Sequence, residues 1–309
     1  MPSTSARFNG HDAATVEARE IVRAQIANAL ATLKGRAVSD SSVHSARKLM
    51  KKARATLRLL RDALPDAVYR LENAALRDAA RPLSATRNAK VLIEALDRLI
   101  DVYGDAARAS APQGLRRALV RERNAIKRGA RMSRSGLEQS RRSLRASLER
   151  SAAWPVGRKG WSIVGQGLRC TYARGRRSFA ESREEHAAES LHEWRKQVQY
   201  LWHQSELMVP LSPGRIGELA DQLHKLSDYL GDDHDLVVLR EKIVAHKSVF
   251  ADAARQAKLL AFVERRRTAL QDKAFVLGAR LYEETPSQFA ARFGRYWREW
   301  RHARAARSA

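Results

Sequence analysis

The sequence VHSARKLMKKARATLRLLR, residues 43–61, begins a predicted helix with one apolar face. Apolar side chains recur at steps of four and three residues, which is the spacing of one face of an α-helix. They are Ala46, Met50, Ala53, Leu57, Leu60 and Leu64. Pro65 follows this face and ends the helix, because proline cannot donate the next helical hydrogen bond. The pattern predicts a helix that packs within a bundle.

A second line of side chains on the same predicted helix is entirely basic. This basic line comprises Arg47, Lys51, Arg54, Arg58 and Arg61. The stretch holds seven Lys or Arg residues and no Asp or Glu. Like charges at i,i+4 destabilise a helix by about 0.2–0.5 kcal/mol per pair, whereas solvated helix faces usually mix both signs. Bound phosphates would relieve the repulsion along the line, which therefore predicts anion binding.

The whole chain is strongly basic. Its 309 residues carry a formal net charge of +24, and of the 58 basic residues 13 are lysine and 45 arginine. A guanidinium group matches two phosphate oxygens at once, whereas an ammonium group acts as a point charge. The balance predicts a polyanionic partner, which is a nucleic acid, an anionic membrane or another phosphate polymer.

Composition excludes several classes of protein. A hydrophobic content of 44% is enough for a core, and the single cysteine, Cys170, excludes an internal disulfide and a multi-cysteine metal site. The first twenty residues hold no apolar segment of a secretory signal, and no run of 18 apolar residues occurs. We therefore expect a protein of the cytoplasm that has no membrane span.

The chain is predicted to be all-α. Prolines stand at or near the ends of periodic segments rich in Ala, Leu, Arg and Glu, and no alternating strand pattern is found. Helices are expected at 11–34, 41–64, 66–80, 83–103, 113–149, 160–187, 189–208, 213–229, 233–247, 250–283 and 287–305. Proline and glycine gather at residues 151–160, which predicts a joint between halves 1–152 and 158–309.

The two halves resemble each other in sequence. VHSARK at 43–48 matches LHEWRK at 191–196 at an offset of 148 residues, and LSATRNAKVLIEAL from residue 83 matches LGDDHDLVVLREKI from residue 230 at 147. Two matches in one order at nearly one offset predict an internal duplication, with two helical bundles side by side.

These motifs, together with GLRCTYARGRRSF at 167–179, resemble the CHAD family, the conserved histidine α-helical domain. The resemblance covers roughly residues 12–300 and implies one CHAD domain of two four-helix bundles related by a pseudo-two-fold axis. It also implies a basic central groove or pore that binds inorganic polyphosphate. Family members are associated with polyphosphate granules or with enzymes of phosphate metabolism, which implies a cytoplasmic location that includes such granules.

The candidate polyphosphate-binding residues come from both halves. In the first half they are Arg19, Arg23, His44, Arg47, Lys48, Lys51, Lys52, Arg54 and Arg58. In the second half they are Arg169, Tyr172, Arg176, Arg177, His192, Arg195, Lys196 and His203. Gln197 and Gln199 stand where the family often has basic residues, so the first half is expected to bind more strongly.

Catalysis and metal binding find little support in the sequence. The candidate metal ligands in the sequence are His192, His203, His224 and His234, with the aspartates of GDDHD at 231–235. No i,i+4 histidine pair has a suitably placed third ligand, and the basic surroundings disfavour a cation. No nucleotide-binding, nucleophile-elbow or zinc-protease motif occurs. We expect a binding protein that is not an enzyme and has no cofactor.

Two other functions remain open. The net charge alone also fits a nucleic-acid-binding protein, although no helix-turn-helix, zinc-finger or RRM signature is found. The chain could also bring polyphosphate to a partner enzyme.

The C-terminal helix carries the aromatic residues Phe289, Phe293, Tyr296, Trp297 and Trp300, which are expected to dock on the second bundle rather than on a membrane.

Overall fold

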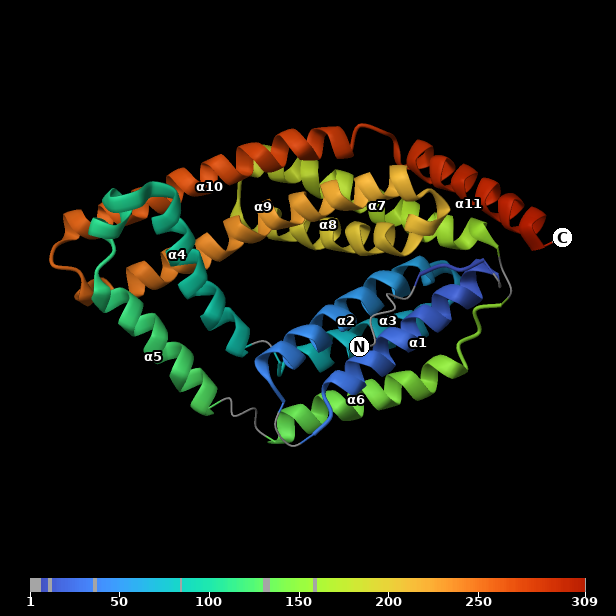
Figure 1. The fold of residues 1–309 in the computed structure, drawn as a ribbon, viewed down its shortest axis with the longest axis horizontal. Helices are drawn as coiled ribbons and strands as arrows, with labels where there is room; N and C mark the ends of the chain where they lie inside the picture. The colour runs from blue at the N-terminus through green and yellow to red at the C-terminus, as the bar shows by residue number, and fades with distance from the viewer. Residues whose placement is uncertain are drawn as a thin grey trace.

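The computed structural model describes residues 7–10, 13–35, 38–83, 85–129, 134–157 and 160–308. Within these residues all regular structure is helical, which confirms the predicted all-α class (Figure 1). The helices are α1 (Ala14–Thr32), α2 (Asp40–Leu59), α3 (Asp66–Ala80), α4 (Ala85–Ser110), α5 (Gln113–Gly129), α6 (Arg134–Ala152), α7 (Trp161–Glu185), α8 (Ala188–Met208), α9 (Pro213–Ala245), α10 (Ala253–Leu281) and α11 (Pro286–Ser308).

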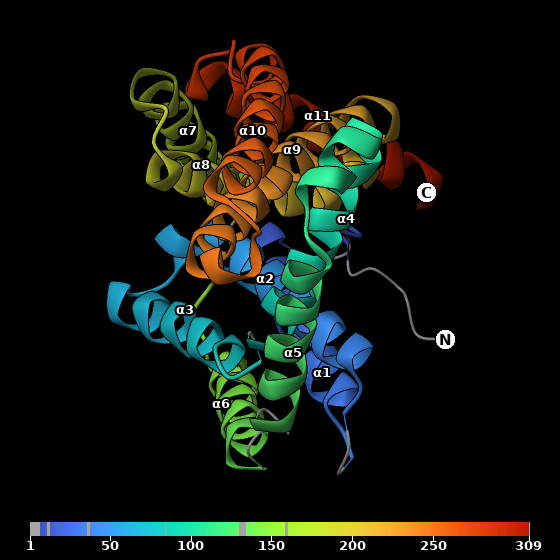
Figure 2. The same cartoon turned by 90° about the vertical axis from the view of Figure 1, so that its left-hand side faces the viewer.

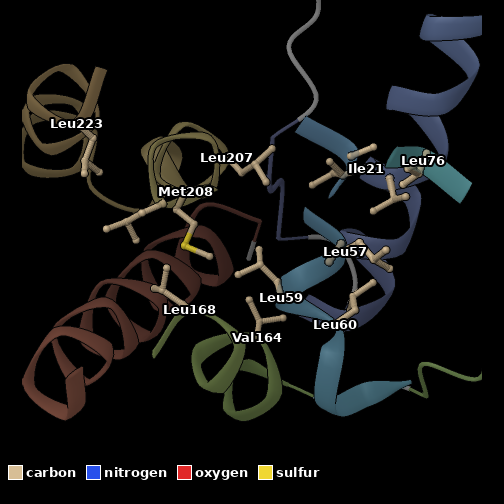
Figure 3. Close-up of a cluster of buried hydrophobic side chains, with 14 of the residues drawn as sticks. Ile21, Leu57, Leu59, Leu60, Leu76, Val164, Leu168, Leu207, Met208 and Leu223 are labelled. Carbon is tan, nitrogen blue, oxygen red and sulfur yellow. The ribbon is translucent and has the colours of Figure 1, made fainter. Parts of the chain in front are cut away.

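Helix α2 lies at the centre of the larger core. The predicted apolar face is buried, with Met50 1% exposed and Leu57 and Leu60 fully buried, and α2 packs against α1 and α3 on this side. Its other side contacts α7 and α8, where Leu59 belongs to the same cluster of buried side chains as Val164, Leu168 and Leu207 (Figure 3). The side chains of the basic line that lie on α2 are only partly buried, between these two apolar sides.

Helices α4 and α5 leave the helices that precede them and pack on the other half of the chain. Leu96 and Leu99 of α4 and Leu119 of α5 form a second core with Leu239 of α9 and Leu259 of α10. Figures 1 and 2 show α4 and α5 reaching across to the end of α10. The predicted halves thus share their hydrophobic cores, and the boundary at 152–158 remains a prediction.

Several predicted helix boundaries differ from the structure. The helix predicted at 41–64 ends at Leu59, where a 3₁₀ turn over Arg61–Ala63 follows, so Pro65 is not what ends it.

Three other differences lie near a glycine. The expected break at residues 230–232 is absent, because Gly231 lies buried inside the continuous helix α9. Helix α4 continues past residue 103, but Gly104 has φ 62° and ψ −142°, so a kink lies where the helix was expected to end. The predicted helix 113–149 is divided into α5, which ends at Gly129, and α6.

The C-terminal helix docks its aromatic face as expected. Phe289 and Phe293 are fully buried, and Tyr172 of α7 stacks on Phe289 with ring centroids 4.0 Å apart. Trp297 stacks on Trp161 at 5.4 Å. In the part of the chain that the structure describes, every helix is too short or too polar to cross a membrane.

Candidate functional site

A cavity of about 350 Å³ lies among α2, α4, α8 and α9. Side chains from both halves of the chain surround it. Its lining comprises His44, Arg47, Lys48, Lys51, Val91, Glu94, Arg98, Arg195, Gln199, Trp202, His203, His224, Ser227, Asp228, Gly231, Asp232 and Asp235. A volume of this size is typical of sites for small ligands or for a segment of a polymer.

Basic side chains of α2 and α8 form one wall of the cavity. Arg47 and Lys51 come from the basic line of α2, and Arg195 comes from α8. The Nη1 atom of Arg47 donates a hydrogen bond to the Ala80 carbonyl at 3.0 Å, at the end of α3. Lys51 Nζ lies 3.4 Å from Gln199 Oε1, which accepts its hydrogen bond. The sequence motifs VHSARK and LHEWRK thus meet at one cavity.

The contact between Lys51 and Gln199 joins residues 148 positions apart, which is the offset between the two motifs. Two further contacts between α2 and α8 are related by the same offset. The Arg58 guanidinium lies 3.9 Å from the centre of the Tyr200 ring, and Lys52 pairs with Glu206 at 3.1 Å. Adding 148 to 52 and 58 gives 200 and 206, so Lys52 corresponds to Tyr200 and Arg58 to Glu206, and the two contacts are reciprocal. The internal duplication itself remains a prediction.

Carboxylates of α4 and α9 form another part of the cavity lining. Glu94 comes from α4, and Asp228, Asp232 and Asp235 come from α9. Arg98 of α4 lies 3.3 Å from a carboxylate oxygen of Asp232 and 3.6 Å from one of Asp235. The cavity is therefore amphoteric, whereas the sequence led us to expect a basic groove.

A second cavity of about 500 Å³ adjoins the first near the beginning of α2. The two share His44, Arg47, Val91 and Glu94 in their linings. Ionic side chains of both signs surround it as well, since Asp40, Lys90 and Glu94 contribute to its lining. The shared residues make the two cavities parts of one depression between α2 and α4.

Beyond the cavity the basic line continues between α3 and α8. Arg54 Nε donates to Asn73 Oδ1 at 3.1 Å, and Arg58 Nη1 donates to the Tyr69 hydroxyl at 3.0 Å. Burial lowers the pKa of the Arg54 guanidinium against the opposing effect of Tyr200, and the charge of Arg58 lowers it further. Both hydrogen-bond partners are neutral, and among the described residues no ion pair of Arg54 or Arg58 with a carboxylate is found, although Asp78 feels the Arg54 charge.

Tyr200 senses the same positive charge. Burial acts to raise the pKa of its hydroxyl, but the Arg58 and Arg54 guanidinium groups outweigh burial and lower the pKa below its ordinary value. A buried phenol whose pKa falls indicates a strongly positive local potential. Such a potential favours an anion along α2 between Lys51 and Arg58.

Lys52 and His203 belong to a different network on α2 and α8. The His203 ring is 4% exposed, and its Nδ1 lies 2.9 Å from Glu206 Oε2, the carboxylate that also pairs with Lys52. Burial acts to raise the pKa of Glu206, but the His203 hydrogen bond and the Lys52 charge outweigh it and hold the pKa at about 2. Lys52 is thus paired with a carboxylate within the protein. His203, in contrast to Lys52, is part of the cavity lining.

His192, the second histidine of the duplicated motif, is absent from the described lining of the cavity. Its ring packs on that of His234 from α9, with centroids 4.7 Å apart and an angle of 34° between the planes. Burial lowers the pKa of His192, and the charges of Lys196 and Arg195 lower it further. Burial and Arg195 likewise lower the pKa of His234 to about 4.

The candidates on α1 and α7 do not line the described cavity. Arg23 Nη1 donates to the Leu148 carbonyl at 2.9 Å, and Arg19 pairs with Glu20 at 3.0 Å. The ring of Tyr172 is fully buried, and its hydroxyl donates toward the carbonyls of Leu281 and Glu284. Tyr172 therefore serves the core of the second half.

Three arginines of α7 and one lysine of α8 lie on the outer surface. Arg169 donates to Gln166, and Arg176 donates to the Tyr282 carbonyl at 3.1 Å. Arg177 lies 3.7 Å from Glu181, and Lys196 pairs with Glu193. All four side chains are exposed, and none of them belongs to the described lining of the cavity with Arg47, Lys51 and Arg195.

Several lining residues were not predicted as polyphosphate ligands. Arg98 and Glu94 of α4 carry no motif that separates them from other charged helix residues. Trp202 stacks on His224 with ring centroids 4.1 Å apart and planes 8° apart, which joins α8 to α9 beside the cavity. Across the described residues no group of three or more His, Cys, Asp or Glu is placed to hold a metal ion.

The fold and the site define an all-α protein with a charged cavity between two groups of helices. The sequence profile of the CHAD domain matches residues 20–244, which is more than half of the chain, so the protein belongs to the CHAD domain family. The structure resembles the crystal structure of the CHAD domain from the plant Ricinus communis, with a TM-score of 0.59 and 16% sequence identity. The match covers 92% of this chain and 96% of the plant chain. No curated protein sequence matches the chain.

Proposed function

We propose that the protein binds inorganic polyphosphate, without catalysis, through the basic wall of the cavity and the adjoining basic line of α2. The observation that carries the proposal is the convergence of Arg47 and Lys51 of α2 with Arg195 of α8 in one cavity. Membership of the CHAD family, which is generally linked to polyphosphate, supports the choice of polymer.

The path of the polymer follows from the geometry of α2. A phosphate chain in the cavity meets Arg47 and Lys51 and then continues between α3 and α8 past Arg54 and Arg58, where the potential is positive. From Arg47 to Arg58 the helix rises about 16 Å at about 1.5 Å per residue. Several phosphates can therefore bind along one helix, and a long polymer gains contacts that a short one lacks.

The acidic part of the lining favours a narrow ligand over a duplex. A single phosphate chain can lie on the basic wall, away from Asp228 and Asp232, whereas a nucleic-acid duplex carries phosphates on every side. Nucleic-acid binding is the alternative that the same experiment distinguishes. Delivery of polyphosphate to a partner enzyme, and a location on polyphosphate granules, remain predictions from the family.

The test is a titration of the full chain with polyphosphate of about 100 units at about 0.15 M salt, with duplex DNA as competitor. Replacement of Arg47, Lys51 and Arg195 by glutamine is expected to weaken binding by about 10- to 100-fold and to reduce the slope of log affinity against log salt by about 2. The slope falls because fewer phosphates are neutralised.

The matched control removes the same three charges from exposed positions on other helices, with Arg117, Lys258 and Arg298 replaced by glutamine. This control is expected to bind almost as tightly as the natural protein. Equal losses in the two triple variants, or full displacement of polyphosphate by duplex DNA, would reduce the protein to a general polycation. Triphosphate that binds as tightly as the long polymer would also contradict the proposal.

A further inference from the structure

The histidine pair formed by His192 and His234 has no role in the proposed contacts with polyphosphate. His192 of α8 and His234 of α9 pack ring to ring at 4.7 Å, yet neither is part of the described cavity lining. The Nδ1 atom of His192 is buried and has no hydrogen-bond partner among the described residues. Two neutral imidazoles in contact leave this polar atom unsatisfied, which is a cost that a folded protein usually avoids.

Each histidine lies one helical turn either from Arg195 or from the glycine beside it. His192 precedes Arg195 by three residues on α8, and His234 follows Gly231 by three residues on α9. A Cβ atom at Gly231 would lie 3.3 Å from Arg195 Nη2, so the guanidinium group rests close over this glycine. The guanidinium group of Arg195, which lines the cavity, thus lies beside Gly231 and on the same helix as His192.

The charges around the pair are mostly positive. Lys51 of α2 and Arg195 and Lys196 of α8 disfavour protonation of His192, whereas Glu193 favours it. The aspartates beside His234 on α9 are engaged elsewhere, since Asp232 and Asp235 face Arg98 of α4 and Asp233 pairs with Arg267 of α10 at 3.1 Å. The negative charge of a polyanion in the cavity would oppose the positive potential that these side chains create at the two imidazoles.

We propose that the His192 and His234 pair takes up a proton when a polyanion occupies the cavity. The inference rests on the proposed function. A proton on one imidazole can be shared as a hydrogen bond with the other ring. The bound polymer would thus be held more tightly as the pH falls.

The direction of the pH dependence follows from linkage. In the free protein the pKa of His234 is about 4 and that of His192 is also below its ordinary value. Bound phosphate raises both pKa values, so protons are taken up between the free and the bound pKa values. One proton taken up strengthens binding by about tenfold for each unit of pH that is lost, within that window.

The experiment measures polyphosphate binding to the full chain by calorimetry in buffers of different ionisation enthalpy, which counts the protons taken up. Sodium polyphosphate of about 100 units is titrated at several values between about pH 8 and pH 5. The His192→Asn/His234→Asn variant is expected to lose most of the proton uptake, and its affinity near pH 8 should stay within a few fold of the natural value. Asparagine keeps a polar group at each position without a titrating ring.

Other histidines line the cavity and require a parallel variant. His44→Asn/His224→Asn removes two imidazoles from the lining, and it is expected to retain the proton uptake that the His192 and His234 pair provides. Undiminished proton uptake in the His192→Asn/His234→Asn variant would overturn the inference. Loss of the proton uptake in the His44→Asn/His224→Asn variant would assign the uptake to the cavity lining and would likewise overturn the inference.

A measurement on the natural protein makes the inference independent of variant folding. Imidazole NMR signals of His192 and His234 are followed against pH with and without saturating polyphosphate, and their pKa values are expected to rise on binding. Unchanged pKa values in the bound protein would overturn the inference and leave the proposed function intact. Absence of polyphosphate binding at every pH would instead contradict the proposed function.

Discussion

At the scale of single residues, Glu206 shows how the interface between α2 and α8 is held. Its carboxylate faces Lys52 from α2 at 3.1 Å and the buried ring of His203 at 2.9 Å. A carboxylate whose pKa is lowered to about 2 stabilises the folded state above the pKa of the unfolded chain, near 4.3 for glutamate. This stability is lost as the pH falls from about 5 towards 2.

Glu206→Gln is therefore expected to lower the free energy of unfolding by about 1–2 kcal/mol near neutral pH, because Lys52 and His203 lose their charged partner. The loss of stability on acidification should be smaller in the variant than in the natural protein. Urea unfolding at neutral and acid pH measures both effects. Glu299→Gln, an exposed control on α11, should change stability by less than about 0.5 kcal/mol, and equal effects of the two variants would contradict the prediction.

At the scale of elements, the contact between α7 and α2 depends on the absence of a side chain at Gly167. A Cβ atom there would lie 2.6 Å from the Leu59 Cα and 2.8 Å from the Arg58 carbonyl oxygen. Both are backbone atoms, which cannot move aside as the end of a flexible side chain can. The crossing of these two helices therefore requires glycine at this position.

Gly167→Ala is expected to destabilise the protein by about 3 kcal/mol through overpacking, although alanine is the better helix former. Gly217→Ala in α9 is the matched control, since its Cβ would meet no atom within 4 Å, and it should stabilise the protein by up to about 1 kcal/mol. Thermal unfolding of both variants tests the contrast. Equal stability of the two variants would show that α7 can shift away from α2 at little cost.

At the scale of the whole molecule, the two halves of the sequence share their interior. The second core joins Leu96 and Leu119 of the first half with Leu239 and Leu259 of the second, and α2 buries Leu59 against α7 and α8. Separation would expose these side chains in either half, at a cost of about 25 cal/mol for each Å² of apolar surface.

Residues 1–157 expressed alone, and residues 158–309 expressed alone, are therefore expected to aggregate or to lack a cooperative unfolding transition. Co-expression should give a soluble complex of the two pieces that unfolds cooperatively. Size-exclusion chromatography and near-ultraviolet circular dichroism distinguish these states. A monomeric, cooperatively folded fragment 1–157 would show that α4 and α5 can find cover within their own half.

Part of the site could be predicted from local sequence. The basic line and the apolar face of α2 follow from helical periodicity, and the motif match selects His44, Arg47 and Arg195, which line one cavity. Their role in binding polyphosphate stays a prediction. Tyr172 was predicted to bind phosphate although it shares a helical face with the buried residues Leu168 and Phe179. That periodic signal was present in the sequence and indicates a core position.

The sequence by itself determined the all-α class and the faces of α2, because side-chain direction repeats every 3.6 residues along a helix and each face can be read locally. The family followed from the motifs of the two halves. Only the tertiary structure decided that Asp228 and Asp232 line one cavity with Arg47, and that the His192 ring packs on His234. Which helices meet depends on burial of apolar surface over the whole chain, and no local pattern records that sum.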